Sequence, residues 1–377
     1  MRRGLLFLLL FALLLPCTAQ AVDLDIEAQA ALLMEKETGQ VLFTKNEHEP
    51  LEPASVTKVM TLLLTMEAID RGAIHYDDVV TVSAYAASMG GSNVYLSEGE
   101  QITVEDLLKA VCVASGNDAA VALGEHVSGV TELFVAEMNN RAKELGMQDT
   151  HFVNCTGLPA EGHVTSAWDV AIMSRELILH HPDIRRFTTI WMDSLRGGEF
   201  QLANTNKLIR FYEGATGLKT GSTSSAGFCV SATAERDGME LIAVILKGST
   251  SQQRFEDAKT LLNYGFSTYA LHRADAESPF EPLPVELGAV DTVALRLPDE
   301  GRTVLLPKGE IANLTQEVTL PPSVAAPVTA GQTVGSLTVR SGEEPVLEIP
   351  ILAAESVAQL RWSEMLLRML QDAFFCG

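Results

Sequence analysis

The stretch Glu52-Pro53-Ala54-Ser55-Val56-Thr57-Lys58 leads directly into an apolar run from Val59 to Met66. A run that is apolar on every side is typical of a buried helix. The i, i+3 spacing places the Ser55 hydroxyl and the Lys58 amine on the same side of the first helical turn. A hydroxyl is a weak nucleophile until a base takes its proton, and a lysine is a base only when its pKa lies well below about 10.4. The stretch therefore predicts a serine nucleophile, with a lysine as its base, at the start of a buried helix.

A second motif, Ser115-Gly116-Asn117, follows an apolar helical segment further along the chain. We expect Ser115 to relay a proton between Lys58 and the leaving group. The Asn117 amide is suited to bind the substrate backbone and to hold Lys58 in place. Alone, this motif is weak, because the same residues also suit a solvated turn.

A third motif, Lys219-Thr220-Gly221-Ser222, begins a β-type region. Lys219 supplies a second cation, which together with burial lowers the pKa of Lys58. Gly221 lets a substrate lie close to the strand, and Thr220 and Ser222 offer hydroxyls for a carboxylate. Because the three motifs occur together and in this order, a single site for acyl transfer explains them better than chance.

Hydrophobic patterning around these motifs predicts the fold class. Short apolar runs at residues 30–35 and 39–44, and again at 227–234 and 239–247, indicate strands. Helical periodicity occurs between and after them, at residues 104–125, 132–145, 167–179 and 251–264. We therefore expect an α/β (α+β) domain in which strands from both ends pair in one antiparallel sheet covered by helices.

The rest of the chain changes character after a proline-rich linker near residues 274–284. Period-two runs at 292–297 and 336–340, separated by proline and glycine clusters, predict a small all-β domain. On a helical wheel, residues 356–377 have a wide apolar face and a narrow polar stripe. Such a helix is typical of a membrane interface, although packing against its own domain or a partner chain would also cover the apolar face.

The N-terminus has the build of a secretory signal peptide. Met1-Arg2-Arg3 precedes an apolar run at residues 4–15, and Ala19-Gln20-Ala21 is a small-residue cleavage site. The apolar run is shorter than the roughly 20 residues of a membrane span, so we expect cleavage after residue 21 and export.

Composition argues against several other functions. A net charge of −22 disfavours nucleic-acid binding, which needs lysine and arginine opposite phosphates. The cysteines show no CxxC spacing, and Cys112 and Cys229 lie in apolar stretches typical of buried thiols. The histidines form no HExxH motif or other paired ligand set, so we expect neither a metal nor another cofactor.

Taken together, the three motifs resemble those of the D-alanyl-D-alanine carboxypeptidase family, the low-molecular-mass penicillin-binding serine peptidases. The resemblance extends over nearly the whole mature chain, with further matching segments at 31–35, 91–92, 96–100, 150–152, 157–158, 254–255 and 264–266. It implies that Ser55 is the nucleophile and Lys58 the general base, supported by Ser115, Asn117 and Lys219. It also implies an oxyanion hole formed by the backbone N–H groups of Ser55 and Ser222, and a role for Arg254 in holding the substrate's terminal carboxylate.

The resemblance also implies how the chain is organised. We expect a signal peptide at 1–21, a penicillin-binding/β-lactamase-like catalytic domain at 22–273, a β-sandwich domain at 274–352 and an amphipathic membrane-anchoring helix at 353–377. The expected enzyme removes the terminal D-alanine from peptidoglycan stem peptides through an acyl-enzyme and is inhibited by β-lactam antibiotics. It would act outside the cell, attached by its C-terminal helix to the outer face of the cytoplasmic membrane.

Two other activities use a similar set of residues. A D,D-endopeptidase cuts cross-links with the same groups, but related endopeptidases tend to lack the C-terminal β domain. A class A β-lactamase needs a glutamate to activate the deacylating water, and no E-x-x-L-N stretch lies between Asn117 and Lys219. The chain departs from its relatives at Ser222, where some carry histidine, and at Gly116, where related β-lactamases carry aspartate.

Overall fold

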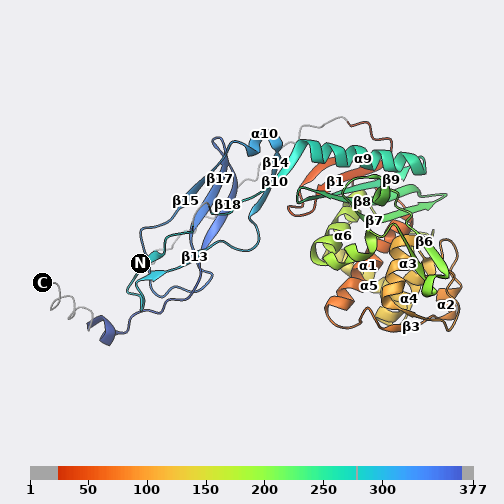
Figure 1. The fold of residues 1–377 in the computed structure, drawn as a ribbon, viewed down its shortest axis with the longest axis horizontal. Helices are drawn as coiled ribbons and strands as arrows, with labels where there is room; N and C mark the ends of the chain where they lie inside the picture. Colours follow the sequence, from red (N-terminus) through yellow and green to blue (C-terminus); the bar gives the residue numbers. More distant parts are fainter. Residues whose placement is uncertain (1–23, 277–278, 367–377) are drawn as a thin grey trace, which may run out of the picture.

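A computed structural model describes residues 24–276 and 279–366. The predicted signal peptide and residues 367–377 of the predicted C-terminal helix lie outside the described residues. Figure 1 shows a larger body of helices around a sheet, followed by an elongated β domain.

The central sheet of the larger body has five strands in the order β2-β1-β9-β8-β7, and every neighbouring pair is antiparallel. Its strands are β1 (Ala30–Glu35), β2 (Val41–Lys45), β7 (Ala215–Thr223), β8 (Gly227–Arg236) and β9 (Met239–Gly248). Because β1 pairs with β9, the predicted pairing of strands from both ends of the domain is confirmed. Strand β7 lies at the edge of the sheet, beside the turn that carries Ser55.

Helices cover both faces of this sheet (Figure 1). On one face, α9 (Ser251–Thr268) packs on β8 and β9 and buries Phe255, Leu261 and Leu262. On the other, α1 (Lys58–Asp70) and α6 (Ala167–His180) contact the sheet and each other. Residues 58–66 are all buried, which confirms the buried helix predicted from its uniformly apolar sequence.

The helical body next to the sheet contains α3 (Val104–Ala114), α4 (Asn117–Ser128) and α5 (Thr131–Glu144). The helical periodicity over 104–125 belongs to two helices, because Ser115 takes a left-handed conformation (φ 62°) and ends α3, as expected for a motif that follows an apolar helical segment. Gly116 then starts α4, and the apolar periodicity continues on both sides of the break. The motif Ser115-Gly116-Asn117 therefore forms the corner between two helices.

Shorter elements complete the larger body. They are η1 (Ala54–Thr57), β3 (Val79–Thr81), α2 (Ala84–Ala87), β4 (Gln101–Thr103), η2 (Pro182–Ile184), α7 (Arg185–Thr188), β5 (Met192–Leu195), η3 (Arg196–Gly198), β6 (Phe200–Ala203) and α8 (Leu208–Phe211).

Cys112, Cys155 and Cys229 are free and buried, and burial raises their pKa values to about 12, 12 and 11. The prediction that Cys112 and Cys229 are buried thiols is confirmed.

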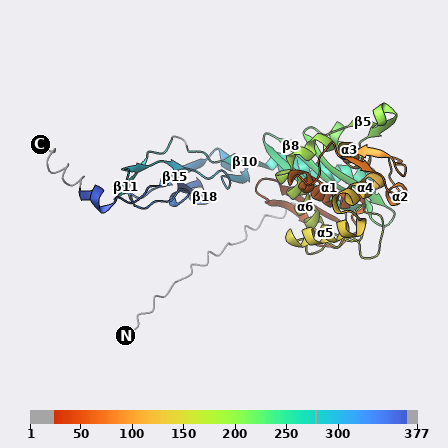
Figure 2. The same cartoon turned by 90° about the horizontal axis from the view of Figure 1, so that it is seen from below.

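The C-terminal part is all β apart from short helical turns, as predicted (Figure 2). Strand β10 (Tyr269–Arg273) continues directly from α9 and pairs with β14 (Thr303–Pro307). Side chains from a three-stranded and a four-stranded sheet share one buried apolar cluster. The remaining elements are β11 (Leu283–Glu286), β12 (Thr292–Val293), β13 (Leu295–Arg296), α10 (Lys308–Ile311), β15 (Leu314–Thr319), β16 (Val324–Ala325), β17 (Thr333–Ser341) and β18 (Glu344–Ala353).

The C-terminal helix begins later than predicted. Residues 356–361 are not helical, because Val357 is buried in the β domain and bridges to Val328, while Gln359 bridges to Gly288. Helical structure starts at residue 362 and continues to 366, the last described residue. Among the described residues, no single helix is both long and apolar enough to cross a membrane.

Candidate active site

The turn that carries Ser55 is held in a strained conformation. Ala54, immediately before Ser55, has a φ of 48°, and its carbonyl oxygen accepts a hydrogen bond from the Thr57 hydroxyl (2.8 Å). The ring of His163 lies 2.8 Å from the same hydroxyl through Nε2, while its Nδ1 accepts from the backbone N–H of Val153 (3.0 Å). Burial lowers the pKa of His163 to about 4, so the ring is neutral and its Nε2–H donates to Thr57. A buried histidine thus fixes the turn, which sequence reasoning missed.

Gly157 is needed for the same turn. A Cβ atom at this glycine would lie 1.8 Å from the carbonyl oxygen of Ala54 and 2.9 Å from the nitrogen of Ser55. The segment around it is ordered by Asn154, whose Oδ1 accepts from the backbone N–H groups of Thr156 and Gly157. The backbone of Gly157 therefore packs directly on the peptide that precedes the nucleophile.

This contact gives a first testable prediction. Gly157→Ala should destabilise the protein by roughly 3 kcal/mol or more, since it adds a backbone clash to a left-handed conformation. It should also slow acylation of Ser55, because the turn must shift to relieve the clash. Thermal unfolding and labelling kinetics would measure both effects.

Gly162 is the matched control, because its φ of 79° is close to the 81° of Gly157 but nothing lies within 4 Å of its Cβ position. Gly162→Ala should cost only about 1 kcal/mol and leave labelling unchanged. Equal effects of the two substitutions would show that packing of Gly157 on Ala54 is unimportant.

Lys58 is fully buried and makes three contacts through its amine. Its Nζ lies 3.0 Å from Ser55 Oγ, 2.6 Å from Asn117 Oδ1 and 2.7 Å from the carbonyl oxygen of Thr156. Burial first, and then the charge of Lys219, lower the pKa of Lys58 well below its usual value. A neutral amine has two N–H donors and one lone pair. Asn117 Oδ1 and the carbonyl oxygen of Thr156 can only accept, so they receive the two N–H donors of the amine. The lone pair is therefore left to accept the hydroxyl proton of Ser55.

The second motif lies against this lysine. Asn117 is 2 % exposed. Its Nδ2 donates to the carbonyl oxygen of Gly90 (2.7 Å), and its Oδ1 accepts a hydrogen bond from Lys58 Nζ. The predicted contact between Asn117 and Lys58 is thus present. The Ser115 hydroxyl is buried and has no hydrogen-bond partner within the described ranges. A buried hydroxyl without a partner is costly, which fits a group that pairs during the reaction.

The third motif lies along β7. Lys219 is 1 % exposed, its Nζ donates to the carbonyl oxygen of Thr220 (2.8 Å), and burial lowers its pKa to about 7. The Thr220 hydroxyl lies 2.7 Å from that of Thr205, which belongs to the loop after β6. Ser222 is exposed at the outer end of the strand. Ser222 is therefore exposed at the sheet edge, whereas Thr220 is buried and its hydroxyl is already paired with Thr205.

The structure shows why position 221 needs a glycine, and the reason differs from the predicted one. A Cβ atom there would lie 2.7 Å from the nitrogen of Ser55 and 2.8 Å from the carbonyl oxygen of Pro53. The glycine thus allows β7 to pack directly on the turn that carries Ser55. Sequence reasoning assigned this closeness to the substrate, but the neighbour is the protein's own backbone.

Arg254 lies against the backbone of the same strand. Its Nη1 donates to the carbonyl oxygens of Gly221 (2.9 Å) and Cys229 (3.2 Å), and burial lowers its pKa to about 10. Its charge also contributes to lowering the pKa of Lys219. The guanidinium therefore adds positive potential behind the strand that carries Thr220 and Ser222.

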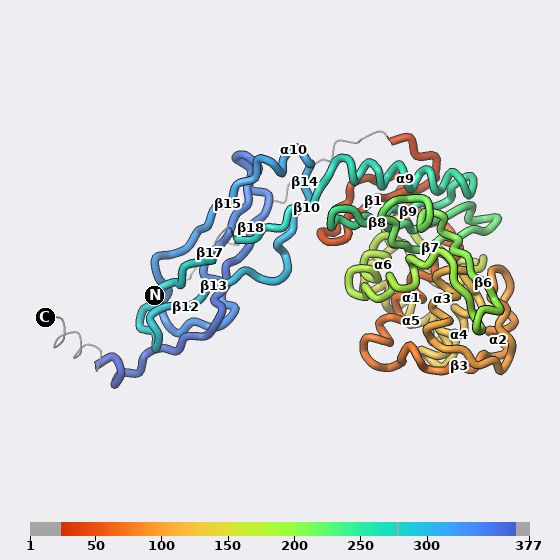
Figure 3. Tube along the Cα trace, in the orientation of Figure 1, coloured from red at the N-terminus to blue at the C-terminus, as the bar shows by residue number. Residues whose placement is uncertain are grey.

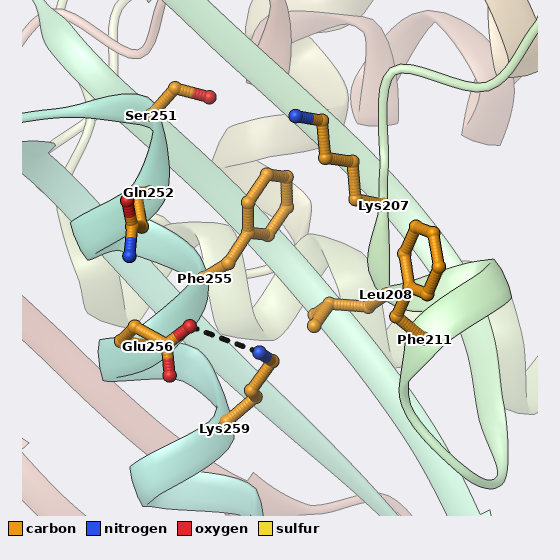
Figure 4. A pocket seen from close by; sticks show the side chains of 8 residues that line it. All are labelled: Lys207, Leu208, Phe211, Ser251, Gln252, Phe255, Glu256 and Lys259. Atoms are coloured by element: carbon orange, nitrogen blue, oxygen red, sulfur yellow. Dashed lines mark hydrogen bonds and ion pairs between the residues drawn. The ribbon is translucent and has the colours of Figure 1, made fainter.

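A separate hollow lies between α8 and the start of α9 (Figure 4). It has a volume of about 450 Å³ and contains no predicted site residue, although Arg254 Nη2 lies 3.4 Å from the hydroxyl of Ser251 on its wall. Its lining residues are Lys207, Leu208, Phe211, Ser251, Gln252, Phe255, Glu256 and Lys259. This hollow is distinct from the serine site.

A serine bonded to a buried lysine, beside a second buried lysine on the edge strand of an antiparallel sheet, defines the class of penicillin-binding serine enzymes. The chain belongs to the D-alanyl-D-alanine carboxypeptidase family, whose model matches residues 17–250. Residues 266–359 match the model of the penicillin-binding protein 5 C-terminal domain.

Individual relatives agree with this assignment. The chain is 41% identical over 355 residues to the D-alanyl-D-alanine carboxypeptidase DacF of Bacillus subtilis, covering 93% of this chain and 91% of that protein. It is similar to the crystal structure of penicillin binding protein 5 from Haemophilus influenzae, with a TM-score of 0.78 and 28% identity over 90% of this chain and 100% of that one. It is also similar to the ampicillin-bound penicillin-binding protein D2 of Listeria monocytogenes (TM-score 0.60, 34% identity, covering 65% and 100%).

Proposed function

We propose that this chain is a serine-type D-Ala-D-Ala carboxypeptidase that removes the terminal D-alanine from peptidoglycan stem peptides through an acyl-enzyme on Ser55. The observation that carries the proposal is the set of three contacts made by the buried amine of Lys58. These contacts leave the amine one lone pair, and they direct it at the hydroxyl of Ser55. The membership of the chain in the carboxypeptidase family supports the choice of substrate.

The first half of the reaction forms the acyl-enzyme. Ser55 Oγ attacks the carbonyl carbon of the penultimate D-alanine while Lys58 takes the hydroxyl proton. The backbone N–H groups of Ser55 and Ser222 bind the developing oxyanion. The bond to the terminal D-alanine then breaks, and its nitrogen receives a proton that passes through the Ser115 hydroxyl.

The second half releases the shortened peptide. A water molecule gives a proton to Lys58 and attacks the ester carbonyl, and Lys58 returns this proton to Ser55 Oγ as the ester bond breaks. Before the terminal D-alanine leaves in the first half, Thr220 and Ser222 bind its carboxylate, with the positive charge of Arg254 behind the strand. Asn117 donates its second amide hydrogen to the substrate backbone, since its first is used by Gly90. No metal or other cofactor is needed for any of these steps.

The alternatives differ in substrate rather than in chemistry. A D,D-endopeptidase would use the same serine and lysines on cross-linked peptides, and a β-lactamase would hydrolyse the acyl-enzyme formed with penicillin rapidly. The C-terminal β domain favours the carboxypeptidase, since this module is matched in penicillin-binding protein 5.

The test compares products from defined muropeptides. Incubation with a monomeric pentapeptide should release D-alanine, whereas cross-linked dimers should be cut slowly or not at all. Mass spectrometry after benzylpenicillin treatment should find a lasting adduct on the peptide that contains Ser55. Preferential cleavage of dimers would favour the endopeptidase, and fast penicillin hydrolysis without an adduct would favour the β-lactamase.

We also propose a signal peptide at 1–21, a catalytic domain at 22–273, a β domain from 274 that extends past the expected limit of 352 to include Val357 and Gln359, and a membrane-anchoring tail after it. In this arrangement the enzyme works outside the cell on the outer face of the cytoplasmic membrane. The β domain would act as a spacer between the anchor and the active site.

Removal of residues 362–377 tests the anchor. Truncation at this point keeps Val357 and Gln359, which belong to the β domain, and so leaves that domain intact. The shortened protein should move from the membrane fraction to the soluble fraction and keep its activity on a soluble pentapeptide. Continued membrane association after truncation would place the anchor elsewhere, and a loss of activity would show that the tail supports catalysis.

A further inference from the structure

The loop between α2 and β4 lies over the second motif of the active site. Its Gly90 and Ser92 carbonyl oxygens accept hydrogen bonds from the side chain and backbone of Asn117, both at 2.7 Å. A Cβ atom at Gly91 would lie 2.8 Å from Asn117 Nδ2. Figure 3 shows α2 and α4 at the same end of the molecule, where the two helices contact each other. The loop therefore forms a wall of the active site.

Tyr95 in this loop is exposed and strained at the same time. Its side chain is 76% exposed, and its φ of 57° is a left-handed value that tyrosine rarely adopts. The loop holds this conformation from two sides. The buried carboxylate of Asp118 accepts from the N–H groups of Val94 (3.1 Å) and Leu96 (3.0 Å), directly before and after Tyr95.

Arg196 holds the other side of the loop. Its guanidinium donates to the carbonyl oxygens of Val94 and Tyr95, both at 3.1 Å, and pairs with Glu100. Arg196 is itself left-handed (φ 53°), so two strained non-glycine residues meet here. The guanidinium carbon of Arg196 lies 5.6 Å from the ring centroid of Phe200. The rings of Phe200 and Tyr95 pack edge to face, with their centroids 6.1 Å apart.

Folding alone does not account for Tyr95. A left-handed position on the surface favours glycine, and an exposed ring recovers little of the strain through burial. Strain that the surroundings hold in place, next to a reaction centre, is typical of a functional position. Because Asp118 follows Asn117 in α4, the same helix end fixes both the catalytic amide and the exposed ring.

We propose that Tyr95 and Phe200 form an aromatic platform for a sugar ring of the glycan strand to which the stem peptide is attached. This inference rests on the proposed carboxypeptidase activity. The apolar C–H face of a pyranose packs on an aromatic ring, whose face is negative, while Arg196 and Glu100 offer partners to the hydroxyls. The platform therefore recognises glycan-linked substrate in addition to its peptide.

The reach of the two chains agrees with this assignment. Tyr95 is four residues beyond Gly91, which touches Asn117, so it lies at most about 13 Å from that point. In a stem peptide, the four residues before the scissile bond also span at most about 13 Å between the reacting carbonyl and the sugar. A sugar at the end of an extended stem peptide can therefore meet the platform.

The test compares Tyr95→Ala with the wild-type protein on two substrates, a disaccharide-pentapeptide and the same pentapeptide without sugar. The substitution should lower kcat/KM for the disaccharide substrate about tenfold, the loss of one aromatic stacking contact, and leave kcat/KM for the free peptide unchanged. Tyr95→Phe keeps the ring and should behave like the wild type on both. Penicillin labelling of all three proteins reports whether the serine site is intact.

Several outcomes would overturn the platform. An equal loss on both substrates would show that Tyr95 acts on the peptide or on the loop geometry, and no loss on either would show that the ring is not used. Activity of the wild type on the free peptide separates this test from the proposed function. A wild-type protein that releases D-alanine from neither substrate contradicts the carboxypeptidase assignment, whatever the variants do.

Discussion

Ser55→Ala is expected to abolish both D-alanine release and penicillin labelling, with a fall in kcat of about 10⁴-fold or more. The hydroxyl is the group whose proton Lys58 is placed to take, since the two N–H donors of its neutral amine are used by Asn117 and Thr156. Without the hydroxyl, neither an ester to the substrate nor one to penicillin can form. D-alanine release from a pentapeptide and the mass of the penicillin-treated protein measure the two effects.

The fold should survive this substitution, because it removes only the hydroxyl of Ser55 and leaves the backbone of the turn unchanged. Ser224→Ala is a matched control, since Ser224 is exposed in the turn between β7 and β8. The control should keep both activities and the same melting temperature. Labelling that persists in Ser55→Ala would place the nucleophile on another residue, and the assignment of Ser55 would be wrong.

The residues of the site were predictable because their chemistry depends on residue type. A lysine three residues after a serine, and a second lysine followed by threonine and glycine, are visible in the sequence, although Lys219 lies in the middle of β7 and not at its start as predicted. The proximity of Lys58 and Lys219 is not visible, since it arises only when β7 packs on the turn at Ser55. The motif order indicated that they share one site, and the fold brings Lys219 near enough for its charge to lower the pKa of Lys58.

Other parts of the site depend on backbone atoms, and sequence reasoning missed them for that reason. The carbonyl oxygen of Thr156 accepts from Lys58, but any residue at that position carries the same oxygen. His163 holds the turn at Ser55 through a hydrogen bond to the Thr57 hydroxyl, and it comes from a loop far away in the sequence. The only signal was Gly157, whose conformation and contact with Ala54 leave no room for a side chain.

The fold shows the same division between periodicity and local conformation. The apolar patterns predicted β1, β2, β8, β9 and the buried helix α1, because burial sets those patterns, but not the full extent of β7, whose sequence includes several polar residues and glycines. The helical periodicity over 104–125 does not show the break between α3 and α4, since the apolar face continues through the corner at Ser115. The apolar patterns also started the C-terminal helix too early, because Val357 is apolar for the sake of the β-domain core.

Lys219→Gln is expected to lower kcat/KM at neutral pH by about 100-fold, since it removes a charged donor from the site. Lys58 acts as a base only in its neutral form, so acylation rises as the pH passes the pKa of Lys58. Burial lowers that pKa most, and the charge of Lys219 lowers it further. Loss of this charge raises the pKa of Lys58, and the acidic limb of the pH profile must therefore move to higher pH.

The pH profile separates this electrostatic role from simple damage to the site. Penicillin acylation rates across pH should show the displaced limb in Lys219→Gln, with activity partly recovered in alkaline solution. Lys207→Gln is the control, because Lys207 is an exposed lysine that lines the separate hollow. The acidic limb of the pH profile of Lys207→Gln should coincide with that of the wild type. A limb that stays in place while the rate falls at every pH would mean that Lys219 binds the substrate but does not set the protonation of Lys58.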